Sequence, residues 1–153
     1  MDQYFRGSAI WRTFLSLLNR LVDRHPTSPA TEPGLDVAEV IRLINVERSS
    51  RNLQALVHFA LLSDSAQDWA ETMARNDTLE HGNFPGRMSA ILPNTAAGED
   101  IGEAYSPGQI VTVWMKSPKH MDNILGRWNV IGVGLARSKS GTPYWCADFD
   151  MTP

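Results

Sequence analysis

The amino-acid sequence predicts an α+β domain in which helices cover an antiparallel sheet. Apolar residues recur at spacings of three and four along much of the chain, which is the period of amphipathic helices. Two β-type runs, 130–136 and 144–149, follow near the C-terminus and are joined by a loop with Ser140-Gly141 at its turn. Such a pair of runs indicates a hairpin. Helices followed by an antiparallel hairpin are typical of a layered α+β fold.

Composition and length indicate one globular domain. The chain has 153 residues, enough for a single core but short for two domains. Hydrophobic residues make up 42% and charged residues 20%, an ordinary balance for a soluble protein. The net charge of -3 gives no basic field for a phosphate backbone, which argues against nucleic-acid binding. Cys146 has no second cysteine to pair with, and no apolar run reaches the roughly 18 residues of a spanning helix.

Residues 1–25 are predicted to form an amphipathic helix. Arg12 and Arg20 interrupt the apolar run, so the stretch does not match a secretory signal. Without that signal we expect the protein in the cytoplasm or in a particle, and extracellular action stays open. The apolar stripe consists of Ile10, Trp11, Phe14, Leu15, Leu17, Leu18, Leu21 and Val22.

A Pro-rich linker is predicted over 26–35, ahead of the domain at 36–153. It contains Pro26, Pro29, Pro33 and Gly34, a composition that favours a semi-extended chain. A helix on such a linker either packs on its own domain or docks on a partner protein, a larger assembly or a membrane surface. A component of a phage particle or of a secretion machine would fit both features.

The elements of the domain follow from capping residues and from the apolar period. Asp36, with Glu39 three residues later, resembles a capping box that starts the first helix. Pro107 is suited to the first position of a later helix. The expected elements are a helix from 36 to about 48, a loop over 53–59, a helix over 60–76, a loop over 82–93 with a turn of helix at 87–92, an extended segment over 97–103 and a helix from 107.

Ser117-Pro118 ends the last of these helices. The proline ring disfavours helical dihedrals at Ser117, so we expect a tight, non-helical turn that carries His120. Tryptophans in apolar periodic runs belong in the core by this reasoning, and Cys146 in a central strand is expected to be an inert buried thiol. The three of the five tryptophans to which this applies are Trp69, Trp114 and Trp145.

Three polar residues are candidates for a site. His81, Glu99 and His120 each fall at the end of an element or in a loop, although none is near another in sequence. Two imidazoles and a carboxylate would suit a borderline divalent ion such as zinc, with water completing the coordination. The alternative is three unrelated surface residues, since no HExxH or CxxC spacing supports a metal.

Several short motifs follow one another along 40–149. They are Leu43-Ile-Asn-Val-Glu-Arg48, Ala70-Glu-Thr-Met-Ala74, His81, Gly98-Glu-Asp-Ile101, Trp114-Met-Lys-Ser-Pro-Lys-His120, Asn123-Ile-Leu125 and Ile131-Gly-Val-Gly134. In this order and spacing they resemble the CAP superfamily, also called SCP-like, which comprises cysteine-rich secretory, antigen 5 and pathogenesis-related proteins. The resemblance is to the disulfide-free bacterial or phage type.

The resemblance implies a three-layer α-β-α sandwich with a central antiparallel sheet and a cleft. In several family members that cleft holds a divalent cation, and the positions carried over are His81, His120 and Glu99. Asp100 stands where the family usually has asparagine, and Ser117 stands where eukaryotic members have a second glutamate. The expected site therefore has three protein ligands and water.

Two functions remain open. The first is a CAP-domain binding module with a divalent-cation cleft, attached to an assembly or surface by its N-terminal helix. The second is a metal-dependent hydrolase of peptide or cell-envelope material, with Glu99 as ligand or general base. A serine hydrolase built from Ser117, His120 and Glu99 lacks a nucleophile elbow and an oxyanion loop. We therefore favour the binding module and leave catalysis open.

Overall fold

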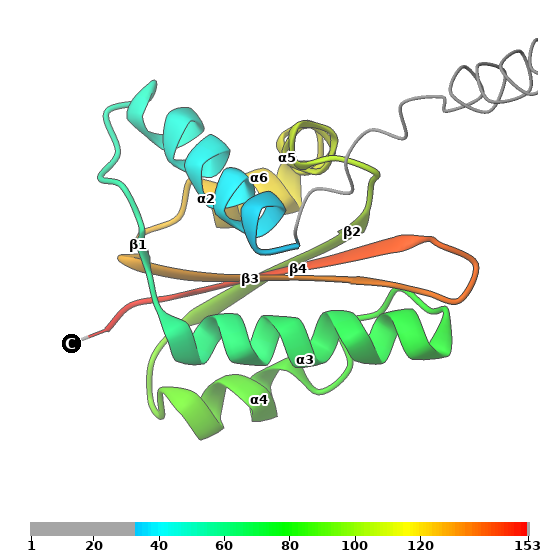
Figure 1. Cartoon of the computed structure of the whole chain (residues 1–153). Helices are drawn as coiled ribbons and strands as arrows, with labels where there is room; N and C mark the ends of the chain where they lie inside the picture. Colours follow the sequence, from blue (N-terminus) through cyan, green and yellow to red (C-terminus); the bar gives the residue numbers. More distant parts are fainter. Residues whose placement is uncertain (1–32, 153) are drawn as a thin grey trace, which may run out of the picture. The chain divides into compact units, whose positions relative to one another are not determined.

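The computed structural model describes residues 33–152, which belong to one compact unit. The helix expected over 1–25 and the linker up to residue 32 lie outside the described residues. Among the described residues, no helix is long and apolar enough to cross a bilayer. The elements in Figure 1 are α2 (Pro33–Ser49), β1 (Val57–His58), α3 (Ala60–Asn76), α4 (Phe84–Ile91), β2 (Ala97–Glu103), α5 (Pro107–Lys116), α6 (Pro118–Ile124), β3 (Val130–Arg137) and β4 (Pro143–Asp150).

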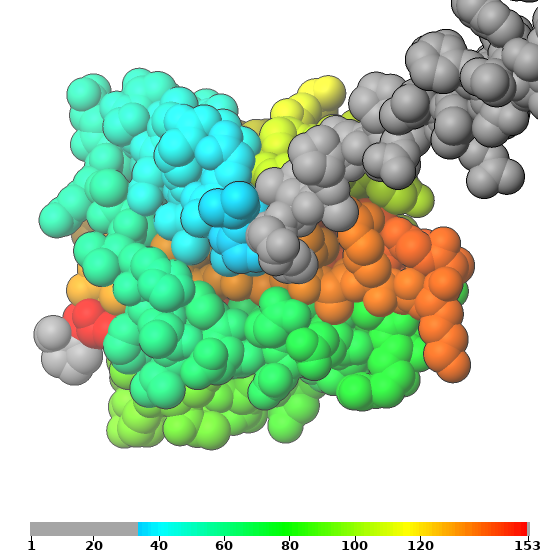
Figure 2. All heavy atoms as spheres, viewed as in Figure 1, coloured from blue at the N-terminus to red at the C-terminus, as the bar shows by residue number. Residues whose placement is uncertain are grey.

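The described strands form one sheet in the order β1-β3-β4-β2. β3 pairs antiparallel with β4 and β4 with β2, whereas the short β1 runs parallel to β3. Helices α2, α5 and α6 cover one face and α3 and α4 the other (Figure 1). In Figure 2 the orange atoms of β3 and of the hairpin are visible between α2 and α3. The predicted α-β-α sandwich and the terminal hairpin are confirmed.

Several boundaries and two elements differ from the prediction. Helix α2 begins at Pro33 instead of Asp36, because proline suits a first helical turn and the acidic Asp36 is favourable within that turn. The expected loop over 53–59 contains the two-residue β1, and α4 is a full helix whose start is capped by the Asn83 side chain. Helices α3 and α5 lie where the sequence predicts them.

The non-helical turn expected around His120 is wrong. Pro118 is the first residue of α6, and His120 lies within that helix. The restriction imposed by the proline falls on Ser117 alone, which is extended with φ -99° and ψ 118° and separates α5 from α6. After it, proline is favourable because its missing N–H is not needed in the first helical turn.

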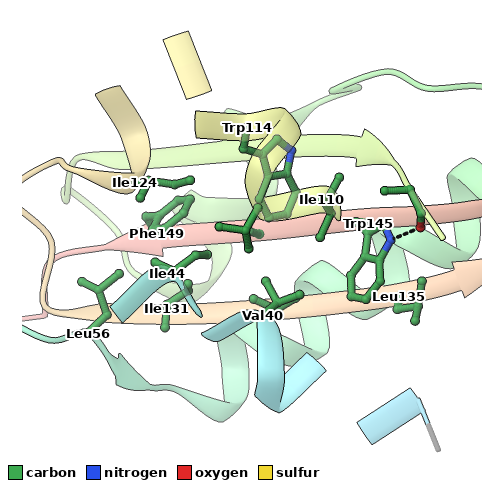
Figure 3. Close-up of a cluster of buried hydrophobic side chains, with 14 residues drawn as sticks. Val40, Ile44, Leu56, Ile110, Trp114, Ile124, Ile131, Leu135, Trp145 and Phe149 are labelled. Carbon is green, nitrogen blue, oxygen red and sulfur yellow. Dashed lines mark hydrogen bonds between the residues drawn. The ribbon is translucent and has the colours of Figure 1, made fainter. Parts of the chain in front are cut away.

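The larger core lies between the sheet and the layer of α2, α5 and α6 (Figure 3). Trp114 and Trp145 are buried, as predicted, and each indole N–H is satisfied by a backbone carbonyl, whereas Trp69 is only half-buried. Trp145 Nε1 donates to the oxygen of Ala104 at 2.7 Å, and Trp114 Nε1 donates to that of Ile101 at 3.0 Å. Labelled with them in Figure 3 are Val40, Ile44, Leu56, Ile110, Ile124, Ile131, Leu135 and Phe149.

On the other face, α3 lies directly against the backbone of β3. A Cβ added to Gly132 would come within 2.2 Å of the carbonyl carbon of Leu62, and one added to Gly134 within 2.4 Å of that of Ala66. Such contacts are far shorter than packed atoms tolerate. The two glycines therefore allow the close approach of helix and strand.

A buried arginine joins α2 to the end of α6. The Arg48 side chain is 2% exposed and donates to the carbonyl oxygens of Ile124 and Gly126 at 2.8 and 2.9 Å. It also donates to the carbonyl oxygen of Gln54 at 2.9 Å. Burial lowers the pKa of Arg48. No described carboxylate pairs with this charge, so backbone dipoles stabilise it.

A half-buried amide joins α6 to β2. Asn123 Nδ2 donates to the carbonyl oxygen of Glu99 at 3.0 Å and to Oδ1 of Asp100 at 2.7 Å. Asp100 is fully buried, and its Oδ2 has no hydrogen-bond partner among the described residues. Burial, opposed by the Asn123 hydrogen bond and reinforced by the charge of Glu99, raises the pKa of Asp100 to about 8.

Replacing Arg48 with methionine should destabilise the domain by about 3 kcal/mol, because several buried carbonyls lose their donor. The matched control is Arg51→Met, which removes exposed contacts with Glu47 and with the Ser50 hydroxyl and should cost less than about 1 kcal/mol. Urea unfolding of both variants measures the difference. Equal stabilities would show that Arg48 does not hold α6 in place.

Asp100→Asn should remove a pH-dependent loss of stability. Because the folded pKa of Asp100 lies near 8 and the unfolded one near 3.8, the unfolded state releases this proton first as pH rises, so Asp100 lowers stability progressively between these values. Asparagine keeps an acceptor for Asn123 and cannot ionise. Urea unfolding at pH 5 and pH 8 should show a smaller fall for Asp100→Asn than for wild type. Asp122→Asn, at an exposed position, is the control. If stability falls as much between pH 5 and pH 8 in Asp100→Asn as in wild type, the raised pKa of Asp100 is contradicted.

Candidate functional site

His81 is presented by the loop between α3 and α4. Helix α3 ends at Asn76, and the left-handed conformation of the following Asp77 (φ 51°) turns the chain; Gly82 has φ +55°. Nδ1 of His81 lies 2.7 Å from Oε1 of Glu99, while the imidazole side chain remains 55% exposed. Nδ1 of His81 is therefore engaged by Glu99, while the rest of the ring is open to solvent.

Glu99 is the centre of the site. It lies on the edge strand β2, and its side chain is 1% exposed. Its Oε1 contacts His81, and its Oε2 accepts from the guanidinium of Arg87 and from Sγ of Cys146 at 3.3 Å. Both carboxylate oxygens are thus occupied by protein donors. Arg87, which the sequence did not mark, is part of this arrangement.

A buried acid and a thiol lie beneath Glu99. Asp148 pairs in register with Glu99 on the neighbouring strand β4, and ligand atoms of Glu99, Cys146 and Asp148 all lie within 4.8 Å of one another. Burial, followed by the charge of Glu99 and offset by that of Arg87, raises the pKa of Asp148 to about 7. Burial and the same carboxylates raise the pKa of the Cys146 thiol well above its usual value. The thiol is fully buried and protonated, in agreement with the predicted inert role.

His120 approaches from α6, in the opposite helical layer. Its Nδ1 is buried and has no hydrogen-bond partner among the described residues. Burial lowers the pKa of His120, and the charge of His81 lowers it further. The neutral form that ligates metals is therefore favoured at His120.

The donors present fit a divalent cation only in part, because the ligand atoms of His81, Glu99 and His120 do not all lie within 4.8 Å of one another. His81 keeps Nε2 available, and the orphaned Nδ1 of His120 marks a ring nitrogen without a protein partner. Glu99 is different, because binding a cation directly would displace one of its present donors. The contact of Glu99 with Nδ1 of His81 suits a role in orienting the imidazole instead. Ser117 makes no side-chain hydrogen bond at the start of α6, and none of the described hydrogen bonds joins it to His120.

Two surface hollows lie elsewhere on the domain. One of about 560 Å³ is lined by Arg127 and Trp128 with their neighbours, and one of about 620 Å³ by Tyr105 and the start of α5. Neither is lined by His81, Glu99 or His120. The candidate site is thus identified by the chemistry of its side chains and not by either of these two hollows.

Comparisons with known proteins agree with this architecture. The chain is 31% identical over 110 residues to the uncharacterized protein YkwD of Bacillus subtilis (strain 168), which covers 67% of this chain and 43% of that protein. This chain thus spans less than half the length of that curated relative. The solved structure of an outer surface protein from Borrelia burgdorferi superposes with a TM-score of 0.73 at 19% identity, covering 80% of this chain and 96% of that one.

A second solved structure is an extracellular protein containing an SCP domain from Bacillus anthracis str. Ames. It superposes with a TM-score of 0.70 at 21% identity, covering 78% of this chain and 41% of that one. The sequence model of the family described as "CAP: Cysteine-rich secretory protein family" matches residues 41–149. That match spans more than half of the chain, and the protein belongs to the CAP family.

Proposed function

We propose that this protein is a CAP-domain binding module that holds a divalent cation, zinc in the simplest case, between His81 and His120. The observation that carries the proposal is the hydrogen bond between Glu99 and His81 Nδ1, beside a second histidine whose Nδ1 lacks a partner among the described residues. A carboxylate that orients a histidine is the usual support of a metal-bound imidazole.

The chemistry of the two rings supports the same proposal. A carboxylate only accepts hydrogen bonds, so His81 carries its proton on Nδ1 and, when neutral, keeps the lone pair on Nε2. The lowered pKa of His120 reduces competition from protons. Because Ser117 supplies no carboxylate, water would complete the coordination.

The alternative is a metal-dependent hydrolase acting on peptide or cell-envelope material. A cation held by two histidines would leave positions for a reactive water. A general base must reach that water, however, and both oxygens of Glu99 are engaged by His81, Arg87 and Cys146. This favours a binding role over catalysis.

Residues 1–25 form the second part of the proposal. Their apolar stripe and the linker after it support attachment of the domain to a partner protein, to a larger assembly such as a virion, or to a membrane surface. The CAP domain would then display its cation site from that support.

Replacing either His81 or His120 with alanine should weaken zinc binding at least about tenfold, because a two-histidine site loses half of its nitrogen ligands. Isothermal titration of the full chain measures this. His58→Ala is the matched control, since that histidine lies on β1 and bonds to Ser63. Zinc binding that survives when both histidines are replaced would refute the site. If the wild type hydrolyses peptide or cell-wall fragments and the double variant does not, the enzyme is favoured instead.

Deleting residues 1–32 should leave a folded domain and abolish its association with other copies or with a membrane surface. Because α2 begins at Pro33, the cut removes no described element. Sedimentation of the full chain and of 33–153, alone and with anionic vesicles, compares the two. Identical behaviour of both proteins under each condition would contradict the attachment role.

A further inference from the structure

We propose that Arg87 and Trp69 are positioning residues that clamp His81 and hold Glu99 against its Nδ1. The two side chains act from α4 and α3, outside the set of candidate ligands. The positioning role itself rests on geometry, and only its effect on zinc rests on the proposed function.

Arg87 contacts both partners of the His81–Glu99 pair. Its Nη2 donates to Oε2 of Glu99, and its Nη1 donates to the backbone oxygen of His81 at 3.0 Å. One planar guanidinium thus fixes the carboxylate that orients the ring and the backbone that carries it. A lysine ammonium is a single point of charge without that fork, so it cannot reproduce both bonds in the same geometry.

Trp69 holds the other side of the loop. Its Nε1 donates to the backbone oxygen of Glu80 at 2.8 Å, and its ring lies beneath the Arg87 guanidinium, with Cζ 4.2 Å from the ring centroid. A Cβ on Gly82 would lie 2.2 Å from Cη2 of Trp69. The loop at 80–82 is therefore bonded at two successive carbonyls and packed against the indole at the third residue.

The positive charge of Arg87 also offsets the negative charge of the buried acids around it. The guanidinium lowers the pKa values of both Asp148 and Cys146, opposing the effects of burial and of Glu99. Its side chain is only 19% exposed, so solvent screens this charge less than at an open surface. Without it, Oε2 of Glu99 keeps only the weak thiol donor, and the carboxylate is free to rotate away from His81.

The test uses the full chain with Arg87→Gln, Arg87→Lys and Trp69→Phe. Nitrogen-15 NMR of the imidazoles measures the tautomer of His81, with His120 as an internal reference, and titration with zinc chloride measures affinity. We expect Arg87→Gln to lose the Nδ1–H preference of His81 and to bind zinc about 10 to 100-fold more weakly. Arg87→Lys should not restore either property, and Trp69→Phe, which keeps an aromatic ring but loses the Glu80 bond, should show a smaller loss of both.

Arg75→Gln is the control, because Arg75 is exposed on α3 and bonds only to Thr72 among the described residues. It should match wild type in both measurements. A wild-type tautomer of His81 in folded Arg87→Gln overturns the inference. If that variant fails to fold, the same result in Arg87→Lys overturns it. Absence of zinc binding in the wild type would refute the proposed function, while the tautomer would still decide the role of Arg87.

Discussion

The buried guanidinium of Arg48 is the contact on which the placement of α6 depends. It carries a full charge into the interior and meets it with carbonyl oxygens from the end of α6 and from the following loop, where the helix dipole is negative. These oxygens would otherwise be unsatisfied at a helix end. The buried charge and the carbonyl oxygens therefore satisfy each other although they are far apart in sequence. The helix that carries His120 is held at two places, by Arg48 and by the Asn123 bonds to β2.

The site follows from the alternation of side chains along one strand. Glu99 faces the layer of α3, where Cys146 and Asp148 of β4 lie below it, whereas Asp100 bonds to Asn123 of α6. His81 belongs to a loop after α3 and His120 to α6. Because β2 ends the sheet, side chains from the two helical layers can meet at its side. His81 bonds to Glu99 from the loop after α3, whereas His120 lies on the short α6, so the two candidate histidines come from different helical layers.

Local pattern predicted the elements that are long and periodic. Helices α3 and α5 and the hairpin of β3 and β4 had clear signals, but the two-residue β1 is too short for any period to show. His81 and Glu99 are 18 positions apart, so only the family resemblance suggested that they approach. Nothing in the sequence marked Arg48 or Arg87, because the burial of a charged residue depends on acceptors supplied by distant segments. The pairing register of β2 with β4, which joins Glu99 to Asp148, likewise exists only in the folded sheet.

The edge of the sheet at β2 has a further consequence for how this protein meets other molecules. The carbonyl oxygens of Glu99 and Ile101 accept hydrogen bonds from Asn123 and Trp114. At the opposite edge, β1 pairs only with residues 130–131 of β3, and farther along β3 the Gln67 side chain bonds both the N–H and the carbonyl oxygen of Leu135. An incoming peptide strand would find these backbone groups already bonded to side chains of the protein. Side chains of the protein itself therefore compete with a foreign strand for backbone hydrogen bonds at both edges.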